Sequence, residues 1–382
     1  MAIKVDNINR EVIEWAIVRA GKDLEEFYLS NPKVEEWVKG DTNPTLKQLE
    51  KFTHKVHVPF GYMFYKKPPM EEIPIPFFRT GKKNPHADKV SLNVYNTIQI
   101  VQERQIWLTE HLKDLGCEDL EFVGKFDVKT SHRTIVHDIR RTLGLSLDWA
   151  SKHNTWEETL NHLTILIEEI GIIVNFNGVV GNNTRRVIQP SECRGFVLVN
   201  KKAPFLFINS TDAKAAQMFT IVHELAHIWI GETAGFDNKQ MLPADDPIEL
   251  LCDQVAAEFL VPKKYLIDKW NKNDNIKYLS KIFKVSPIVI ARRALDLGLI
   301  NKKSFFSFYN NYINDLKAKK ENSKNSGGNF YATAKKRISL RFASFVNNAV
   351  KQNSLLYRDA YRLTTLKGNT YDRFINEYLY QS

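Results

Sequence analysis

The first part of the chain alternates short apolar segments with turn residues. Between residues 8 and 66, this pattern predicts a small domain of short helices with the sequences INREVIEWAIVRA, LEEFYL, VEEWVKG, LKQLEKFTHKVH and FGYMFY. The Pro-rich stretch PPMEEIPIPFFRTGKKNP at 68–85 interrupts the helical periodicity and is the best candidate for a linker. Apolar residues then recur at spacings of three and four over about 89–115, which predicts one long helix.

The pattern changes from residue 155 onward. A helix, TWEETLNHLTILIEEIG, is followed by IIVNFN, RGFVLVN and PFLFINS, whose alternating or continuous apolar runs are typical of short strands. Two helices are expected next, at about 211–231 and 247–260, and further helical segments extend to 300. The polar stretch KKENSKNSGGN at 319–329 predicts a flexible connection, after which the last fifty residues are again of helical type.

A chain of 382 residues is too long for one ordinary hydrophobic core, so we expect several compact units. The changes of pattern predict a helical domain at 1–67, a linker and helical connector at 68–150, a mixed domain at 151–300 and a helical module at 301–382. The fold class expected from this order is mostly α with a small β-sheet, that is, α+β.

The composition is that of a soluble globular protein, with 43% hydrophobic and 26% charged residues. No stretch approaches the roughly 20 apolar residues that cross a bilayer, so we expect no membrane contact. The N-terminal segment carries charges throughout and has no secretory pattern. Cys117, Cys193 and Cys252 lie far apart and form no CxxC pair, which argues against a disulfide framework. These features predict a cytoplasmic protein.

The strongest chemical signal is the motif HELAH at 223–227. His223 and His227 are four residues apart on a predicted helix, so both imidazoles project from one face and can bind a single tetrahedral ion. Glu224 follows the first histidine, at the position where a metallopeptidase base polarises the attacking water. The alternative is a solvated helix with two incidental histidines. Against it, the motif lies among the apolar residues Phe219, Ile221, Val222, Leu225, Ala226, Ile228 and Trp229.

A zinc site of this type needs a third protein ligand, which thermolysin-like enzymes take from a glutamate about twenty residues further on. Glu249 lies 22 residues after His227, in PIELLCDQVAAEFLVP. Asp253 falls four residues later on the same helix face, where it could accept the second ring N–H of a ligating histidine. Glu258 is a competing ligand candidate, although its spacing from Glu249 places it elsewhere on the helix. We therefore expect one zinc ion held by His223, His227 and Glu249.

These motifs resemble the ImmA/IrrE family of metallo-endopeptidases. The resemblance covers about 150–300 and is carried by HELAH together with Glu249, Asp253, Ala256, Ala257, Leu260 and Pro262. The chain departs from the family at Cys252, where alanine is usual, and at Val255, where phenylalanine is usual. The resemblance implies a gluzincin-like peptidase that cuts a helix-turn-helix repressor and so derepresses stress, phage or mobile-element genes.

The segment EEWVKGDTNPTLKQLEKFTHKVHVPFGYMF resembles the second half of a phage-repressor-type (XRE-like) helix-turn-helix domain. The ImmA/IrrE family includes fusions with such an N-terminal domain, often associated with toxin–antitoxin systems. The resemblance implies that NPKVEEWVKG is the reading helix, with Lys33 and Lys39 as its candidate DNA contacts. Glu35 and Glu36 in the same helix would repel DNA, so the alternative is a domain that keeps this fold without binding DNA.

The net charge of +10 is concentrated in residues 301–382, which contain 15 Lys+Arg and 5 Asp+Glu. The basic cluster beside Phe330 and Tyr331 predicts a nucleic-acid contact through Lys335, Lys336, Arg337 and Arg341. SLLYRDAYRLTTLKGNTYDRFINEYL has the outline of a helix, a glycine-containing turn and a second helix. The alternative is a solvated charged face that packs on the peptidase.

Three functions are compatible with these signals. The first is a zinc-dependent metallo-endopeptidase whose protein substrate is a helix-turn-helix repressor. The second is a transcription regulator or antitoxin-type protein that uses the metal fold as a sensor or scaffold and cuts no peptide. Glu224 favours the first, because a scaffold needs the ligands and has no use for a base beside them. The third is a zinc hydrolase with a non-peptide substrate, since HExxH specifies water activation without naming the bond that is cut.

Overall fold

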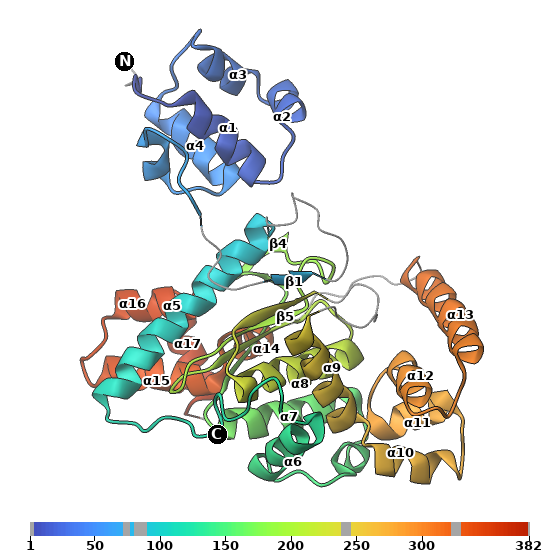
Figure 1. The fold of residues 1–382 in the computed structure, drawn as a ribbon. Coiled ribbons are helices and arrows are strands. Elements are labelled where there is room, and N and C mark those ends of the chain that lie inside the picture. Colours follow the sequence, from blue (N-terminus) through green and yellow to red (C-terminus); the bar gives the residue numbers. More distant parts are fainter. Residues whose placement is uncertain (1–3, 72–76, 80–89, 238–245, 322–329, 381–382) are drawn as a thin grey trace. The chain divides into compact units, whose positions relative to one another are not determined.

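The computed structural model describes residues 4–71, 77–79, 90–237, 246–321 and 330–380. They form two compact units, each with its own hydrophobic core (Figure 1). The first unit comprises the described part of residues 1–74 and 83–96, and the second comprises that of 75–82 and 97–382. Among the described residues, no helix combines the length and the apolar character that crossing a membrane requires.

The first unit is a set of short helices. They are α1 (Arg10–Arg19), α2 (Leu24–Ser30), α3 (Pro32–Lys39), α4 (Leu46–Val56) and the 3₁₀ helix η1 (Phe60–Phe64). Thr45 and Gln48 form a capping box at the start of α4, and Gly40, with a left-handed φ of 84°, ends α3. A single residue, Asn31, separates α2 from α3. The five helical segments predicted for residues 8–66 are therefore confirmed.

The predicted linker at 68–85 contains a strand, β1 (Phe77–Arg79), at the edge of the sheet in the second unit. The prediction of a linker is wrong for these three residues. An edge position explains how a strand can form within a Pro-rich stretch, because proline is tolerated next to an edge but not inside a sheet. The other residues of the predicted linker after 71 lie outside the described part of the chain.

The long helix predicted over about 89–115 is α5 (Leu92–Asp114). Gln105 on α5 donates its Nε2–H groups to the carbonyl oxygens of Leu198, at 2.7 Å, and Ala203, at 2.9 Å. These carbonyls flank the turn between two central strands of the sheet, β5 (Gly195–Leu198) and β6 (Phe205–Asn209). The amide therefore anchors α5 to the sheet without leaving buried carbonyls unsatisfied.

Five strands form the sheet of the second unit, in the order β1-β7-β5-β6-β2, with β2 at Ile173–Asn177 and β7 at Ala234–Asp237. β2 pairs in parallel with β6 and β1 with β7, whereas β5 is antiparallel to both β6 and β7. Every residue of β2, β5 and β6 is buried. A separate hairpin pairs β3 (Val179–Val180) with β4 (Asn183–Val187).

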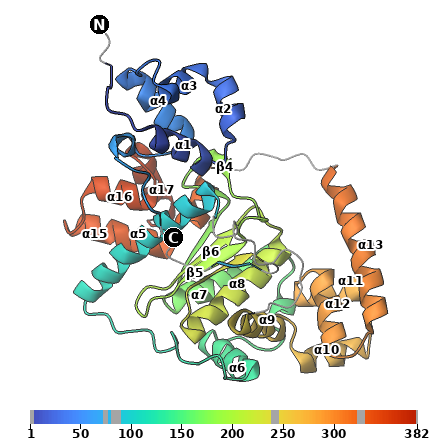
Figure 2. The same cartoon turned by 45° about the horizontal axis from the view of Figure 1, so that its top comes forward.

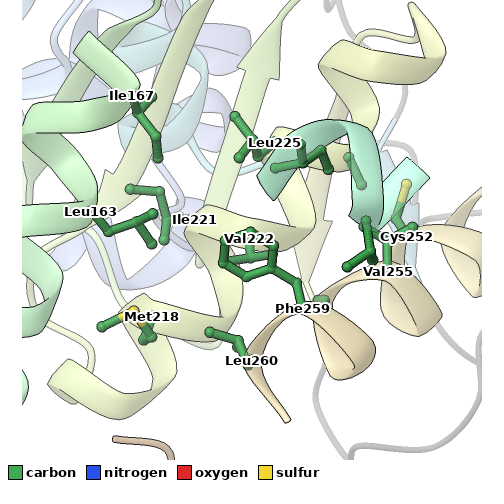
Figure 3. Close-up of a cluster of buried hydrophobic side chains, with 14 of the residues drawn as sticks. Leu163, Ile167, Met218, Ile221, Val222, Leu225, Cys252, Val255, Phe259 and Leu260 are labelled. Atoms are coloured by element: carbon green, nitrogen blue, oxygen red, sulfur yellow. The ribbon is translucent and has the colours of Figure 1, made fainter. Parts of the chain in front are cut away.

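Helices cover both faces of this sheet (Figures 1 and 2). On one face, α7 (Trp156–Glu169) and α8 (Lys214–Ile230) contact the strands, and α9 (Pro247–Leu260) packs across α8. On the other face, the ring of Phe342, on α15 (Leu340–Lys351), meets Phe205 of β6 edge-on at 5.7 Å between centroids. Figure 3 shows the apolar cluster between α7, α8 and α9, which includes Leu163, Ile167, Met218, Ile221, Val222, Leu225, Cys252, Val255, Phe259 and Leu260. The predicted class, mostly helical with a small sheet, is confirmed.

The second unit contains further helices. They are α6 (His132–Thr142), the 3₁₀ helix η2 (Trp149–Lys152), α10 (Lys263–Trp270), α11 (Ile276–Phe283), α12 (Pro287–Asp296), α13 (Lys302–Glu321), α14 (Phe330–Ile338), α16 (Tyr357–Thr364) and α17 (Asn369–Tyr378). Gly368 precedes α17, so the predicted succession of helix, glycine-containing turn and helix is confirmed. α13 continues through 319–321, where we predict a flexible connection, and that prediction is wrong there. The rest of the predicted connection, 322–329, lies outside the described residues.

The region 301–382 does not form one separate body. α13 packs against α12, whereas α14 packs against the edge strand β2. Arg104 on α5 is fully buried and donates from Nε to the carbonyl of Leu363, at 2.8 Å, and from Nη1 to that of Arg337, at 3.1 Å. These carbonyls lie near the C-terminal ends of α16 and α14, where the helix dipoles are negative. Burial lowers the pKa of Arg104 to about 10.

Residues 120–126 hold the last turn of α8, which follows the predicted metal motif. The backbone N–H of Gly124 donates to the carbonyl of Ile228 at 2.9 Å, and that of Phe126 donates to Trp229 at 3.0 Å. Carbonyls in the last turn of a helix have no partner within it, so these bonds satisfy them. The indole N–H of Trp229 donates to Asp138 on α6 at 3.1 Å. The loop and α6 together fix the last turn of α8.

Asp138 is the buried carboxylate of this arrangement. It also pairs with Lys125, at 2.9 Å, and with Arg141. Burial opposes its ionisation, but hydrogen bonds from Lys125 and Trp229 outweigh this and hold the pKa of Asp138 below its ordinary value. The charged form is therefore the one that stabilises the fold.

We expect Asp138→Asn to lower the free energy of unfolding of the second unit by about 1–3 kcal/mol at neutral pH, because buried donors lose a charged acceptor. The folded-state pKa is depressed, so this contribution is present above the ordinary pKa of about 4 and is lost as the pH falls through the folded value. Thermal unfolding of both proteins across this range measures the effect. A Tm difference that does not shrink in acid would contradict the assignment.

Candidate metal centre

The motif HELAH lies in the middle of α8, the helix packed between the sheet and α9. His223, Glu224 and His227 each have 0% of their surface exposed, and Glu249 has 5%. The helix is apolar around the motif, which explains why it is buried on all sides. Gly231, with a left-handed φ of 88°, ends α8, and a Cβ there would lie 2.9 Å from the Cα of Gly124. A glycine is thus required where the helix meets the loop that holds it.

Three side chains bring their ligand atoms to a common point. Nε2 of His223 lies 3.3 Å from Nε2 of His227 and 3.1 Å from Oε2 of Glu249, and Oε1 of Glu249 lies 3.2 Å from Nε2 of His227. Ligand atoms held at about 2.0–2.1 Å from a tetrahedral zinc ion are separated by about 3.3 Å. Among the residues that the structure describes, these three form a group that could hold a metal ion. The observed spacings therefore fit one small tetrahedral cation.

The unsatisfied atoms in this group support the same conclusion. Both carboxylate oxygens of Glu224 and the Oε1 atom of Glu249 are buried and have no hydrogen-bond donor among the described residues. The 3.2 Å contact of Oε1 with His227 meets the distance of an ion pair but not the geometry of a hydrogen bond. Buried carboxylates without partners are costly, and a bound cation with its water would satisfy them.

The protein groups alone set unusual pKa values here. Burial opposes a charge on His223, but hydrogen bonds to Asp253 and Glu249 raise its pKa to about 10. Burial also opposes the charge on Glu249, yet its hydrogen bond with His223 and its contact with His227 lower its pKa to about 2. Burial raises the pKa of Glu224 well above its ordinary value. A divalent cation reverses the local charge balance, favouring neutral imidazoles and an ionised Glu224.

Asp253 occupies the predicted supporting position. Its Oδ1 lies 3.0 Å from Nδ1 of His223, the ring nitrogen opposite the one that faces the ligand group. That contact fixes the tautomer and the ring orientation of the histidine. Glu258, the competing ligand candidate, instead forms an ion pair with Arg293. Cys252 is buried on α9 in the apolar cluster, and burial raises the pKa of its thiol well above the ordinary value.

Gly195 at the start of β5 is a site residue that the sequence does not reveal. A Cβ at this position would lie 2.5 Å from Cγ2 of Thr220 and 3.4 Å from Oε1 of Glu224. The absence of a side chain therefore lets β5 approach α8 beside the predicted base. The one signal in the sequence is a glycine at the start of the apolar run RGFVLVN, which by itself suggests only a close backbone approach.

Comparison with family models now places this centre in a known domain type. Residues 167–295, about a third of the chain, match the peptidase M78 model, described as an IrrE N-terminal-like domain. The middle of the chain is an IrrE N-terminal-like metallopeptidase domain. Its buried His223, His227 and Glu249 match the gluzincin motif. Residues 338–377 match a domain of unknown function (DUF8813). A search of curated proteins finds no match to the chain.

The residues predicted to contact nucleic acid are not among the ligands of the metal centre. In the first unit, Lys33 is exposed, and Lys39 pairs with Glu35 at 2.6 Å. In the second unit, the four basic residues contact neighbours within the fold. Lys335 lies over the ring of Tyr378, Lys336 pairs with Glu157, Arg337 donates to Asn182, and Arg341 lies over Phe345. Nucleic-acid binding by these residues stays a prediction, and so does the alternative of a charged face packed on the peptidase.

A graded series of variants tests the metal ligands. We expect Asp253→Ala to weaken zinc binding by roughly 10–100-fold, because it removes the partner that orients His223. His223→Ala and Glu249→Ala should weaken binding further, since each removes a ligand atom. Cys252→Ala should leave the affinity unchanged. Competition with a chromophoric chelator measures all four, and a loss in Cys252→Ala as large as that in Glu249→Ala would reject the ligand set.

A salt series tests the nucleic-acid prediction. If Lys335 and Arg341 contact phosphates, changing each to glutamate should weaken DNA binding and reduce the slope of log K against log salt by about 0.9 for each lost contact. Lys264→Glu, at an exposed position on α10, makes the same charge change elsewhere and should have little effect. The prediction fails if the full-length protein binds no DNA at low salt, or if all three variants bind as the wild type does.

Proposed function

We propose that the protein is a zinc-dependent metallo-endopeptidase with Glu224 as its catalytic base. The observation that carries this proposal is the carboxylate of Glu224, which is fully buried beside the three ligand residues and has no hydrogen-bond partner among the described residues. Such a group is costly to keep in a folded protein unless it serves a ligand or a reaction. A structural metal site has no need of it.

The donor set supports zinc as the ion. Two imidazole nitrogens and one carboxylate leave a fourth tetrahedral position open, as in catalytic zinc sites, whereas structural sites are closed by four protein ligands. Calcium and magnesium prefer oxygen ligands and higher coordination numbers. His223 and His227 must both be neutral at the ligating nitrogen, and Asp253 supports this by accepting the other ring N–H of His223.

The metal ion and the residues around it have different roles in peptide hydrolysis. A bound zinc ion supplies Lewis acidity, which lowers the pKa of water and polarises the scissile carbonyl. Glu224 accepts a proton from the attacking water and delivers it to the leaving amine nitrogen. Gly195 lets β5 lie close to α8 beside the Glu224 carboxylate, because a side chain there would collide with Thr220. Water adds across the amide bond, and the products are a carboxylate and an amine.

A helix-turn-helix repressor is the proposed substrate, and its cleavage would derepress stress, phage or mobile-element genes. This part rests on the resemblance of the motif region to the ImmA/IrrE family and on the match of residues 167–295 to the IrrE N-terminal-like domain. The unit at the N-terminus is a set of short helices, and its repressor-like character rests on the resemblance alone. The competing regulator would use the same metal fold without cutting a peptide.

Glu224→Gln separates the two functions. The glutamine keeps the shape of the side chain but cannot accept a proton, so we expect cleavage of a helix-turn-helix protein encoded beside this gene to fall by at least about 100-fold. Zinc content should stay near one ion per chain, because the ligands are unchanged. Mass spectrometry of the products detects the new peptide terminus. Full cleavage by the glutamine variant would reject the assigned base, and no cleavage by the zinc-loaded wild type would favour the regulator.

A further inference from the structure

The metal centre is closed to solvent in this conformation, although a peptidase has to admit a polypeptide. His223, Glu224 and His227 have no exposed surface, and Glu249 has 5%. A catalytic base acts only within hydrogen-bond reach, about 2.6–3.2 Å, of the proton that it removes. A substrate peptide must therefore displace part of the chain before it can react.

The strand β7 pairs with β5, the strand whose Gly195 lies beside Glu224. β7 begins four residues after α8 ends and pairs antiparallel with β5. In this pairing Phe236 is the partner of Gly195, the residue beside the carboxylate of Glu224. β7 thus takes the edge of β5 that runs past the catalytic base. An extended peptide that added a strand to β5 would need the same edge.

The strand β1 secures β7 from the outside. It pairs in parallel with β7, and Phe78 is the partner of Phe236. One row of the sheet therefore runs from Phe78 through Phe236 to Gly195. β1 has only three residues and lies in the segment 75–82, between the two parts of the first unit in sequence and far from β7. A ladder this short is among the easiest parts of a sheet to release, because few hydrogen bonds and little packed surface hold it.

From these placements we propose that β1 and β7 form an intramolecular inhibitor of the metallopeptidase domain. β7 takes the place of an extended substrate on β5, and β1 keeps β7 there. Release of β1 frees β7 and opens the centre, which would activate the enzyme. The proposal that β1 and β7 inhibit cleavage rests on the proposed peptidase function. The proposal that they control access to the metal does not depend on it.

The test replaces β1 in the full-length, zinc-loaded protein. Phe78→Pro introduces a residue that cannot donate a backbone hydrogen bond to a ladder. A milder second variant, Phe77→Gly, Phe78→Ser and Arg79→Gly together, keeps the chain length and lowers the strand propensity. Met70→Pro is the matched control, because Met70 is 93% exposed in the same connector and lies outside the strand. Thermal unfolding checks that each variant is folded.

Two measurements follow on each protein. The first is the rate at which a chelator removes zinc, which reports access to the centre without any need for catalysis. The second is kcat/KM for an unstructured peptide. We expect both β1 variants to lose zinc at least tenfold faster than the wild type and Met70→Pro, and to gain peptide cleavage by a similar factor. Hydrogen exchange at the backbone of β5 should accelerate in the same variants.

The outcomes separate the two proposals. If zinc release becomes faster but none of the proteins cleaves the peptide, β1 and β7 control access to the metal and the proposed peptidase function is rejected. If all four proteins cleave the peptide with the same kcat/KM and release zinc at the same rate, the inhibitory role of β1 and β7 is rejected. The proposed peptidase function is then supported. If Phe78→Pro does not fold, the milder variant decides, and zinc release from it at the wild-type rate overturns the proposal.

Discussion

The burial of two histidines and two glutamates in an apolar core is the constraint on which the rest of the second unit depends. His223, Glu224, His227 and Glu249 lie where the sheet, α8 and α9 leave almost no access to water. Moving charged groups from water into such a place is costly unless they meet a counter-charge. The ligand atoms are spaced for one small cation, which supplies that counter-charge. Metal binding and packing of α8 against α9 are therefore coupled, since the ligands come from both helices.

The position of α8 is then set at several points along its length. Gly124 and Phe126 satisfy the carbonyls of its last turn, and Asp138 accepts the indole N–H of Trp229. At its middle, Gly195 allows β5 to approach. Shifts of a few tenths of an ångström at these contacts would change the distances between ligands on α8 and α9, and a tetrahedral metal site tolerates little of that. The contacts around α8 thus determine metal geometry as much as the ligands do.

The sequence predicts the parts of this centre that follow from local periodicity. Two histidines four residues apart on an apolar helix must share a face, and a glutamate four residues before an aspartate places both on one side of the next helix. Gly195 and Asp138 could not be found in this way, because their roles depend on which distant segments pack together. The strand β1 was hidden for the same reason, since three residues within a Pro-rich stretch carry no periodic signal and gain their structure only from β7.

The C-terminal helices illustrate the limit of charge patterns. Residues 301–382 hold the whole net charge, which predicts a separate basic module, yet α14 packs on β2 and its cations contact neighbours within the fold. Arg104 on α5 donates hydrogen bonds to carbonyls near the ends of α14 and α16. Because no carboxylate takes part, the sequence contains no oppositely charged residue that would indicate this contact. The residues matched by the domain of unknown function therefore support the sheet from the side opposite α8.

Desolvation links the chemistry of the centre to its accessibility. A carboxylate removed from water is a stronger base toward a water molecule on a metal, and hydrogen bonds and charges act more strongly in a dry site. The same closure excludes a polypeptide, so a centre this buried cannot be both permanently closed and active. The short ladder between β1 and β7 is a physical solution to this conflict, because it can open at small cost while the apolar core of α7, α8 and α9 stays packed. Activation then needs no change in the ligands, only the exchange of one strand for another on the edge of β5.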